Sequence, residues 1–573
     1  MAKITPAAVF SDHMVLQRNK NISIFGYSDS EVVVTAALFD NKGSLLSRNS
    51  ARSFNGRWDV QLEPQVAQEG CRLTVSGPSR ASGTADTSSQ TAVTQIAEFS
   101  DISIGEVWIA GGQSNMEFEL QNCTEGPEEL ANEKEPNVRF YYTNKIAWKD
   151  DHYYEAERNT CWQTWESDGK KAWSAVGYFF AKKLAKDLGC TVGIIGCNWG
   201  GTSASCWMKK EYLEKDSDLN TYLTEYEEAT RGKTVEQQCR EYEDYEKDFA
   251  KWNEKYSELW QKNHNISWDE AQKIIGTNPW PGPKSCKNPF RPAGLYDCML
   301  SRIMPYTVKG VIWYQGESDD HKPTMYAKLF STMIDNWRSD WHDDSLPFVF
   351  VQLPVNRYEP DKDYKHWPLV REAQTKVHNT VKNAWMISAM DLGVFNDIHP
   401  KHKKELAQRM ENNALCNVYH MAEEAKVMAP IMKDVFIRAP KESQKGTITI
   451  SFNNADSGFE VRDDSEKLEN YKKAEAIQGT PLPEDFTGFE VAGRDGVYYP
   501  AEFAFGGSDG KLNTITLCSK KVREPVFARY CWYNYGPVTI YGKNGLPLAP
   551  FRTSTADGKA TGEHAAIQQI MEL

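Results

Sequence analysis

Three polar segments of the chain contain residue types that together could perform acyl transfer. In the first, Ser114 follows the apolar run Val107–Ile109 and the pair Gly111–Gly112. A serine at the turn from a buried strand into a helix holds its hydroxyl clear of the sheet. The free N–H groups of the helix lie beside it, so the turn could provide a nucleophile and part of an oxyanion site. Alternatively, Ser114 is only a helix N-cap, which is a common role for serine.

The two later segments could supply a general base and an acid. Gly310–Asp319 reads as a strand that runs into a polar turn containing Gln315 and Glu317. His399 lies in a loop before a helix that begins near Lys403, with Asp397 two residues upstream. An α/β sheet gathers such loops at one edge, and serine, histidine and acid are the groups of an acyl-transfer triad. A single loop histidine is usually a surface residue, but three such loops in one chain favour a shared site.

These motifs resemble those of the sialate O-acetylesterases, a family within the SGNH (GDSL-like) hydrolases. The resemblance covers nearly the whole chain, and the pairing of Gly112–Met116 with Gln315–Glu317 is its most specific part. The other matching motifs are Phe10–Arg18, Gly56–Trp58, Trp199–Thr202, Trp313–Ser318, Asp397–Pro400, Gly545–Pro547 and Pro550–Arg552.

The resemblance implies a serine esterase in which Ser114 attacks an acetyl carbonyl and His399 is the general base. Asp397 is the first candidate for the carboxylate that orients the imidazole. The superfamily pattern places an aspartate three residues before the histidine, but position 396 is asparagine. Glu317 and Asp391 therefore stay open as alternative acids.

The oxyanion of the tetrahedral intermediate needs hydrogen-bond donors. The backbone N–H of Ser114 and one from Gly200–Gly201, with Gly201 preferred, fit this role, because glycine permits close approach of the main chain. The family resembled here implies Gln315 as a third donor. We expect no metal and no other cofactor: His399 and His402 are three residues apart, but no further ligand completes a set.

The substrate implied by the resemblance is an O-acetylated sugar, with O-acetylated sialic acid first. An acetylesterase of plant polysaccharides, chiefly acetylxylan, is the alternative. A carbohydrate-binding protein without catalysis is an alternative of another class, which the presence of Ser114, Gln315 and His399 disfavours. The chain also contains 18 Trp and 26 Tyr, whose rings can stack on sugars or fill cores.

Composition limits the partners. The formal net charge of −13 disfavours a nucleic-acid surface, and no apolar run is long enough to span a membrane. No Cys-x-x-Cys pair occurs among the 12 cysteines, so neither a zinc site nor a disulfide framework is expected. Several cysteines in apolar runs read as small buried residues: Cys197, Cys298, Cys416, Cys518 and Cys531. We expect a periplasmic or secreted protein whose signal was removed, with a cytoplasmic protein as the alternative; the oligomeric state stays open.

The order of the predicted elements indicates three parts. Residues 1–100 form a β module, residues 101–430 an α/β catalytic domain, and residues 431–573 a second β module and tail. Strands alternating with helices predict an SGNH-type three-layer α/β/α sandwich with a mostly parallel sheet. The predicted helices are 175–188, 325–337 and 369–381, and the predicted strands of this domain include 192–196, 348–353 and 385–389. Strands of the β modules are predicted at 22–26, 31–39, 58–62, 72–75, 446–451, 488–492, 514–517 and 528–532.

Two segments have two interpretations each. A helical insertion at 209–285 carries an apolar seam on one long helix, at Tyr242, Tyr245, Phe249, Trp252, Tyr256 and Leu259. In one interpretation it borders the mouth of the active site. In the other, which is favoured, it is a hairpin that packs its aromatic residues on the domain or across a dimer. A following helix is predicted to begin at Ser267 with a capping box to Glu270.

Arg371–Gln374 either serves the pocket or is a solvated helix face. The segment Ser79–Thr94 reads as a long loop, and the tail from Ala556 as weakly anchored.

Overall fold

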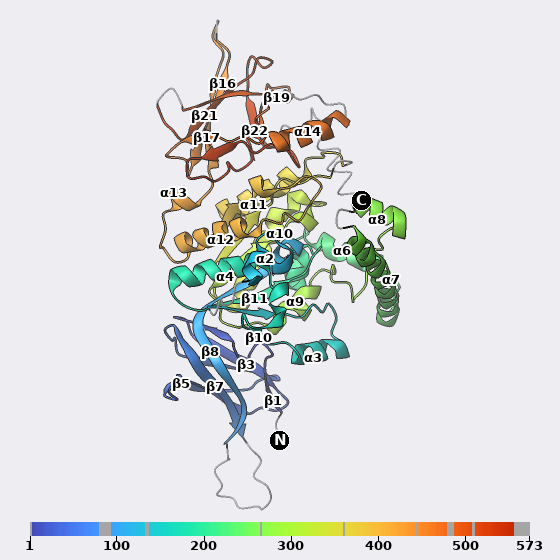
Figure 1. Ribbon diagram of the computed structural model, residues 1–573, viewed down its shortest axis with the longest axis vertical. Helices are drawn as coiled ribbons and strands as arrows, with labels where there is room; N and C mark the ends of the chain where they lie inside the picture. The colour runs from blue at the N-terminus through green and yellow to red at the C-terminus, as the bar shows by residue number, and fades with distance from the viewer. Residues whose placement is uncertain are drawn as a thin grey trace, which may run out of the picture.

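The computed structural model describes residues 3–78, 93–131, 137–263, 266, 268–358, 361–442, 444–477, 486–506 and 510–554. Figure 1 shows an elongated molecule with an N-terminal β region at one end, a mixed α/β region in the middle and a C-terminal β region at the other end. The helices of the insertion lie along one side of the middle region (Figure 1). Most of the predicted loop 79–94, the predicted start at Ser267 and the tail from Ala556 lie outside the described residues.

The N-terminal strands belong to two sheets. One contains β1 (Ile4–Pro6), β3 (Ile22–Ser28) and β6 (Arg57–Leu62). The others join the large central sheet through β8 (Val93–Gly112): β2 (Val15–Gln17), β4 (Val33–Phe39), β5 (Leu45–Arg52) and β7 (Gln68–Pro78).

The strand β8 joins the N-terminal region to the middle region. Its first half pairs with β7, from Val93 opposite Pro78 to Ile104 opposite Gln68. Its second half pairs with strands of the α/β region as far as Gly112. The predicted boundary at residue 100 falls inside this strand, and apolar residues of both regions form one continuous core.

The central sheet has eleven strands in a mixed arrangement. Its main path runs β10, β9, β11, β8, β12, β13, β14. Apart from β10, which is antiparallel to β9, each strand of this path pairs in parallel with the next. The bounds are β9 (Val138–Tyr142), β10 (Trp162–Gln163), β11 (Val192–Asn198), β12 (Gly310–Tyr314), β13 (Phe348–Gln352) and β14 (Ala384–Ser388). Val107, Trp108 and Ile109 of β8 are fully buried, as their apolar run predicts.

One of the helices that accompany this sheet begins and ends where local signals predict. The helix α4 (Ala175–Leu188) starts after Ser174, whose hydroxyl accepts from the Gly177 N–H, and ends at Gly189 in the left-handed region. The predicted helices 325–337 and 369–381 correspond to α10 (Tyr326–Trp341) and α11 (His366–Thr380). The helix after His399 is α12 (Lys403–Asn417).

The described residues of the insertion form four helices. They are α5 (Lys210–Glu214), α6 (Asn220–Ala229), α7 (Val235–Lys262) and α8 (Trp268–Ile275). The predicted seam lies on α7, where Tyr242 and Trp252 are buried. The indole N–H of Trp252 donates to the Gly276 carbonyl at 2.7 Å, which fixes the end of α8 against α7. The aromatic seam therefore packs within the insertion.

The C-terminal region has its own apolar core. Its strands are β15 (Ile431–Arg438), β16 (Thr447–Asn453), β17 (Phe459–Val461), β18 (Phe489–Ala492), β19 (Tyr498–Pro500), β20 (Glu502–Phe505), β21 (Thr514–Cys518), β22 (Phe527–Tyr530), β23 (Ile540–Gly542) and β24 (Phe551–Arg552). One helix, α14 (Ser465–Ile477), accompanies them. Four of the five cysteines predicted as buried are buried, whereas Cys518 at the end of β21 is partly exposed.

Arg371 fastens the C-terminal region to the middle region, so the interpretation of Arg371–Gln374 as a solvated helix face is wrong. Its side chain is fully buried, and its guanidinium donates to the carbonyls of Tyr533 at 3.0 Å and Asn534 at 2.7 Å. Burial lowers the pKa of this guanidinium to about 10. Gln374 is buried too and donates to the carbonyls of Gln315 and Val351. These side chains are structural links between segments.

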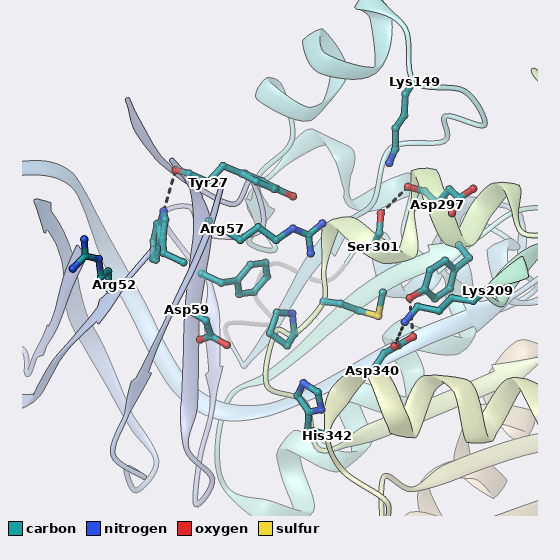
Figure 2. Close-up of a pocket in the computed structure, with 16 residues that line it drawn as sticks. Tyr27, Arg52, Arg57, Asp59, Lys149, Lys209, Asp297, Ser301, Asp340 and His342 are labelled. Carbon is teal, nitrogen blue, oxygen red and sulfur yellow. Dashed lines mark hydrogen bonds and ion pairs between the residues drawn. The ribbon is translucent and has the colours of Figure 1, made fainter. Parts of the chain in front are cut away.

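A large cavity lies at the junction of the N-terminal β region and the middle region. Figure 2 shows it between the strands that carry Tyr27 and Arg57 and the segment with Asp297 and Ser301. Its volume is about 690 Å³. None of the predicted site residues lines it.

Within the described part of the chain, no helix has the length and apolar character needed to cross a membrane.

Candidate active site

Parallel pairing brings the loops that follow β8, β11 and β12 to one edge of the sheet. The strand β8 lies between β11 and β12, with Asn198 and Tyr314 both opposite Gly112. The chain leaves each strand at this edge. Gly112 has a φ of +135°, and a Cβ there would lie 2.1 Å from the Tyr314 carbonyl oxygen. Only glycine fits this turn, which leads directly into the helix α1 (Ser114–Glu117).

Ser114 and His399 form a hydrogen-bonded pair. The Nε2 atom of His399 lies 2.8 Å from the Oγ atom of Ser114, although the two residues are 285 positions apart. The ring of Phe118 stacks on the imidazole at a centroid distance of 6.3 Å. The N-cap of α1 is Gln113, so the alternative that Ser114 is an N-cap is wrong. This pair has the geometry in which histidine can remove the serine proton.

The three candidate acids lie in different surroundings. Asp397 accepts the backbone N–H of His399 at 2.9 Å. Asp391 is held by a bidentate pair with Arg409, and Glu317 accepts the Asn115 side-chain N–H at 2.7 Å. Among the described residues, no hydrogen bond joins the Nδ1 atom of His399 to any of these carboxylates. Asp397 acts on the imidazole through its charge, which favours the protonated ring.

Glu117, which the sequence analysis did not consider, also faces this site. Its carboxylate accepts a hydrogen bond from the Gly200 N–H at 2.7 Å and forms an ion pair with Lys145. Its charge acts on His399 in the same direction as that of Asp397. Its position three residues after Ser114 was visible in the sequence, but such a residue reads simply as part of the first turn of a helix.

Two of the predicted backbone donors make no hydrogen bond to a described residue. The N–H of Ser114 is at the first position of α1 and so has no partner within the helix. The Gly200 N–H is engaged by Glu117, whereas that of Gly201 makes no hydrogen bond to a described residue. Gly201 has a φ of +74°, which favours glycine. Gly200 lies beside the serine, since a Cβ there would be 3.1 Å from the Ser114 Cβ.

Gln315 differs from the expectation. Its side chain is fully buried, and its Nε2 atom donates to the Asp319 carboxylate at 2.7 Å and to the Thr202 carbonyl at 3.1 Å. Its Oε1 atom accepts the Tyr326 hydroxyl at 2.9 Å. Both amide hydrogens are therefore engaged, and the structure leaves no free Gln315 donor for an oxyanion. The side chain instead ties the β12 loop to the loop of Thr202.

A buried polar network that the sequence analysis missed connects the serine helix with the histidine loop. The side-chain N–H groups of Asn115 donate to Glu317 at 2.7 Å and to the Ile398 carbonyl at 2.9 Å. The Nζ atom of Lys403 donates to Asn115 Oδ1 at 2.6 Å and lies 4.9 Å from the ring centre of Phe118. Burial raises the pKa of Glu317 to about 7 and lowers that of Lys403 to about 7. The network fixes Ile398, the neighbour of His399, against the residue that follows Ser114.

Lys403→Met should therefore destabilise the protein and reduce esterase activity. Methionine keeps the apolar stem but leaves the Asn115 oxygen without its donor, and the loss of such a buried bond costs about 1–3 kcal/mol. The midpoint of urea unfolding, together with kcat, measures the effect.

The neighbouring Lys404→Met is the matched control. The Lys404 side chain is 44% exposed and makes a 3.6 Å ion pair with Glu129, so its loss should cost less than about 1 kcal/mol. Equal unfolding midpoints for the two variants would contradict the structural role of Lys403.

The pH profile should show a base with a low pKa. Burial, and then the charge of Lys403, lower the pKa of His399 below its usual value of 6.5, against the opposing charges of Asp397 and Glu117. His399 must be unprotonated to accept the serine proton, so activity falls as the pH drops through this pKa. We expect the acid limb of kcat/KM for a small acetate ester to have its midpoint below pH 6.5. A midpoint above that value would contradict the assignment.

A cavity of about 210 Å³ opens beside these loops. Gly201 and Ser318 connect it with the Ser114 site, and most of its remaining wall comes from the insertion and the segment that follows it. Its lining residues are Gly201, Ser203, Ser205, Tyr222, Glu225, Tyr226, Trp280, Pro281, Lys284, Phe290, Pro292, Ser318 and His321. The insertion thus borders the cavity beside Gly201, whereas the favoured interpretation was a hairpin that packs its aromatic residues on the domain or across a dimer.

Comparison with known proteins assigns the family. The family model "Carbohydrate esterase, sialic acid-specific acetylesterase" matches residues 104–262 and 282–416. Sialate O-acetylesterase of Mus musculus is 24% identical over 438 residues, which are 72% of this chain and 73% of that protein. The Homo sapiens sialate O-acetylesterase is 23% identical over 72% of this chain and 71% of its own length.

A solved structure shares the fold. The crystal structure of a carbohydrate acetylesterase from Xanthomonas citri superposes with a TM-score of 0.67 at 24% identity, covering 96% of this chain and 100% of that chain. The family match extends over more than half of the residues and includes Ser114, Gln315 and His399. The chain therefore belongs to the sialic acid-specific acetylesterase family of carbohydrate esterases.

Proposed function

We propose that this esterase removes O-acetyl groups from a sugar through an acetyl-enzyme formed on Ser114. The observation that carries the proposal is the 2.8 Å contact between Ser114 Oγ and His399 Nε2. In the first half-reaction, Oγ bonds to the acetyl carbon while its proton moves to Nε2. The bond between that carbon and the sugar oxygen then breaks, and this oxygen takes the proton from Nε2.

The second half-reaction regenerates the serine. A water molecule gives a proton to Nε2 and bonds to the acetyl carbon, and the bond to Oγ then breaks. Acetate leaves and Oγ regains its proton from His399. The N–H groups of Ser114 and Gly201 are the donors that we assign to the negative oxygen of both tetrahedral intermediates. Asp397 is the carboxylate that we assign to His399, because its charge stabilises the imidazolium ion that forms in each step.

We also propose the SGNH-type α/β/α sandwich for the middle region. The parallel neighbours of β8 and the accompanying helices α4, α10, α11 and α12 support this finer description. Such a sandwich places the ends of its parallel strands at one edge, where catalytic loops collect.

O-acetylated sialic acid is the substrate we place first, because the family model and the mammalian relatives are described by it. Acetylated xylan is the alternative, because its acetyl esters offer the same carbonyl group to Ser114. Acetate release from 9-O-acetylated sialic acid and from acetylated xylan, measured in parallel, tests both. Release from the first alone supports the proposal, release from xylan alone supports the alternative, and release from neither contradicts both.

A further inference from the structure

An exposed tryptophan lies against the glycine to which we assign an oxyanion donor. Trp280 is 54% exposed, yet a Cβ on Gly201 would lie 3.1 Å from its indole Cζ2 atom. Phe290 supports the indole edge-on, with ring centres 5.6 Å apart and planes at 77°. A large aromatic side chain that the fold leaves half uncovered beside a reactive centre has surface available for a ligand.

The insertion and the segment that follows it hold Trp280 in this position. Its backbone N–H donates to Asn278 Oδ1 at 2.7 Å, and the Asn278 N–H donates to Gln272 Oε1 of α8 at 3.1 Å. The Gly276 carbonyl accepts the Trp252 indole N–H of α7. These bonds fix the segment between α8 and Phe290, so the helices α7 and α8 of the insertion position the indole.

The same cavity carries an unbalanced positive charge. Lys284 lines it and forms no ion pair with any residue that the structure describes. The one carboxylate of the wall, Glu225, is paired with Lys322 at 2.5 Å. The ring of His321 packs edge-on against Tyr222, with centres 6.3 Å apart. An ammonium group in such a wall favours an anionic group on the ligand.

We propose that Trp280 and Lys284 form the sugar subsite of this esterase and select an acidic sugar. The sugar ring stacks on the indole, which lies next to Gly201, and its carboxylate faces Lys284. This inference rests on the proposed function, because it takes the acetyl group to be held between Ser114 and Gly201. In this arrangement the helical insertion binds the sugar, and the loops at the sheet edge carry the catalytic groups.

The test compares esters that share the acetyl group and differ in the alcohol. Trp280→Ala should lower kcat/KM for 9-O-acetylated sialic acid at least about ten-fold, by loss of the aromatic contact. Hydrolysis of p-nitrophenyl acetate, which has no sugar, should stay within about two-fold of wild type. The matched control is Trp260→Ala, because Trp260 is 48% exposed on α7 of the same insertion and does not line the cavity.

Lys284→Met separates charge from stacking. We expect it to lower kcat/KM for the acidic sugar about ten-fold and to leave acetylated xylan and p-nitrophenyl acetate unchanged. Lys273→Met, at an exposed position of α8, is the charge control and should change none of the three.

The outcomes distinguish this inference from the proposed function. If Trp280→Ala slows p-nitrophenyl acetate as much as the sugar ester, Trp280 supports the fold of the site and the subsite is overturned. An unchanged rate on the sialic acid ester overturns it too, as does a wild-type protein that cleaves p-nitrophenyl acetate but no acidic sugar ester. Full p-nitrophenyl acetate hydrolysis by Ser114→Ala would instead overturn the proposed function itself.

Discussion

Ser114→Ala is expected to reduce acetate release by at least about 10⁴-fold, because no other group of the site can form the acetyl-enzyme. Its Oγ atom is the one hydroxyl oxygen that contacts His399 among the described residues. The substitution removes one atom at the start of a short helix whose N-cap is Gln113, so the fold should be retained. Acetate release and circular dichroism of the two proteins measure the two effects.

A fluorophosphonate probe gives a second readout that does not depend on the identity of the sugar. The probe should add once to the wild-type protein at the peptide that contains Ser114 and should leave the alanine variant unmodified. Ser301→Ala is the matched control, since Ser301 lines the distant cavity of Figure 2. Labelling of another serine in the active protein would show that the nucleophile has been assigned wrongly.

His399→Ala should cause a loss of similar size, about 10⁴-fold in kcat, because the serine proton then has no acceptor. The double variant with Ser114→Ala should be no slower than either single variant, since the two residues act as one unit. Initial rates on p-nitrophenyl acetate measure all three proteins without requiring a sugar.

His402→Ala provides the comparison for the histidine. Its side chain is 63% exposed, and its Nδ1 atom lies 3.4 Å from Glu125, away from the serine. We expect wild-type rates from this variant. Losses that multiply in the double variant would show that Ser114 and His399 do not act in the same step.

The sequence predicted those parts of the fold that local signals determine. The helix α4 lies between a serine cap and a left-handed glycine, and both are visible in the sequence beside an apolar run. Val107–Ile109 is an apolar run followed by two glycines, and it is a buried strand. The pairing of β8 was less accessible, because its partners are chosen by contacts far apart along the chain.

The site was predicted where several motifs in one chain pointed to the same chemistry. Ser114 and His399 are in contact, as the order of the loops suggests. Gln315 was placed by resemblance, but the direction of an amide depends on neighbours such as Asp319 and Tyr326, which the sequence does not orient. Lys403 lies in a lysine-rich run that reads as a solvated helix face, yet it is buried. Trp280 lies in a proline- and glycine-rich segment without any periodic pattern.

The continuity of β8 has a consequence for how this enzyme can be divided. The strand that ends at Gly112, two residues before Ser114, begins among the strands of the N-terminal region. A cut at residue 100 would leave each fragment with half a strand and an open sheet edge. The N-terminal region and the sheet that leads to the nucleophile share this strand and one continuous apolar core, so we expect them to unfold together. We therefore expect unfolding that begins in the first hundred residues to displace the Ser114 hydroxyl as well.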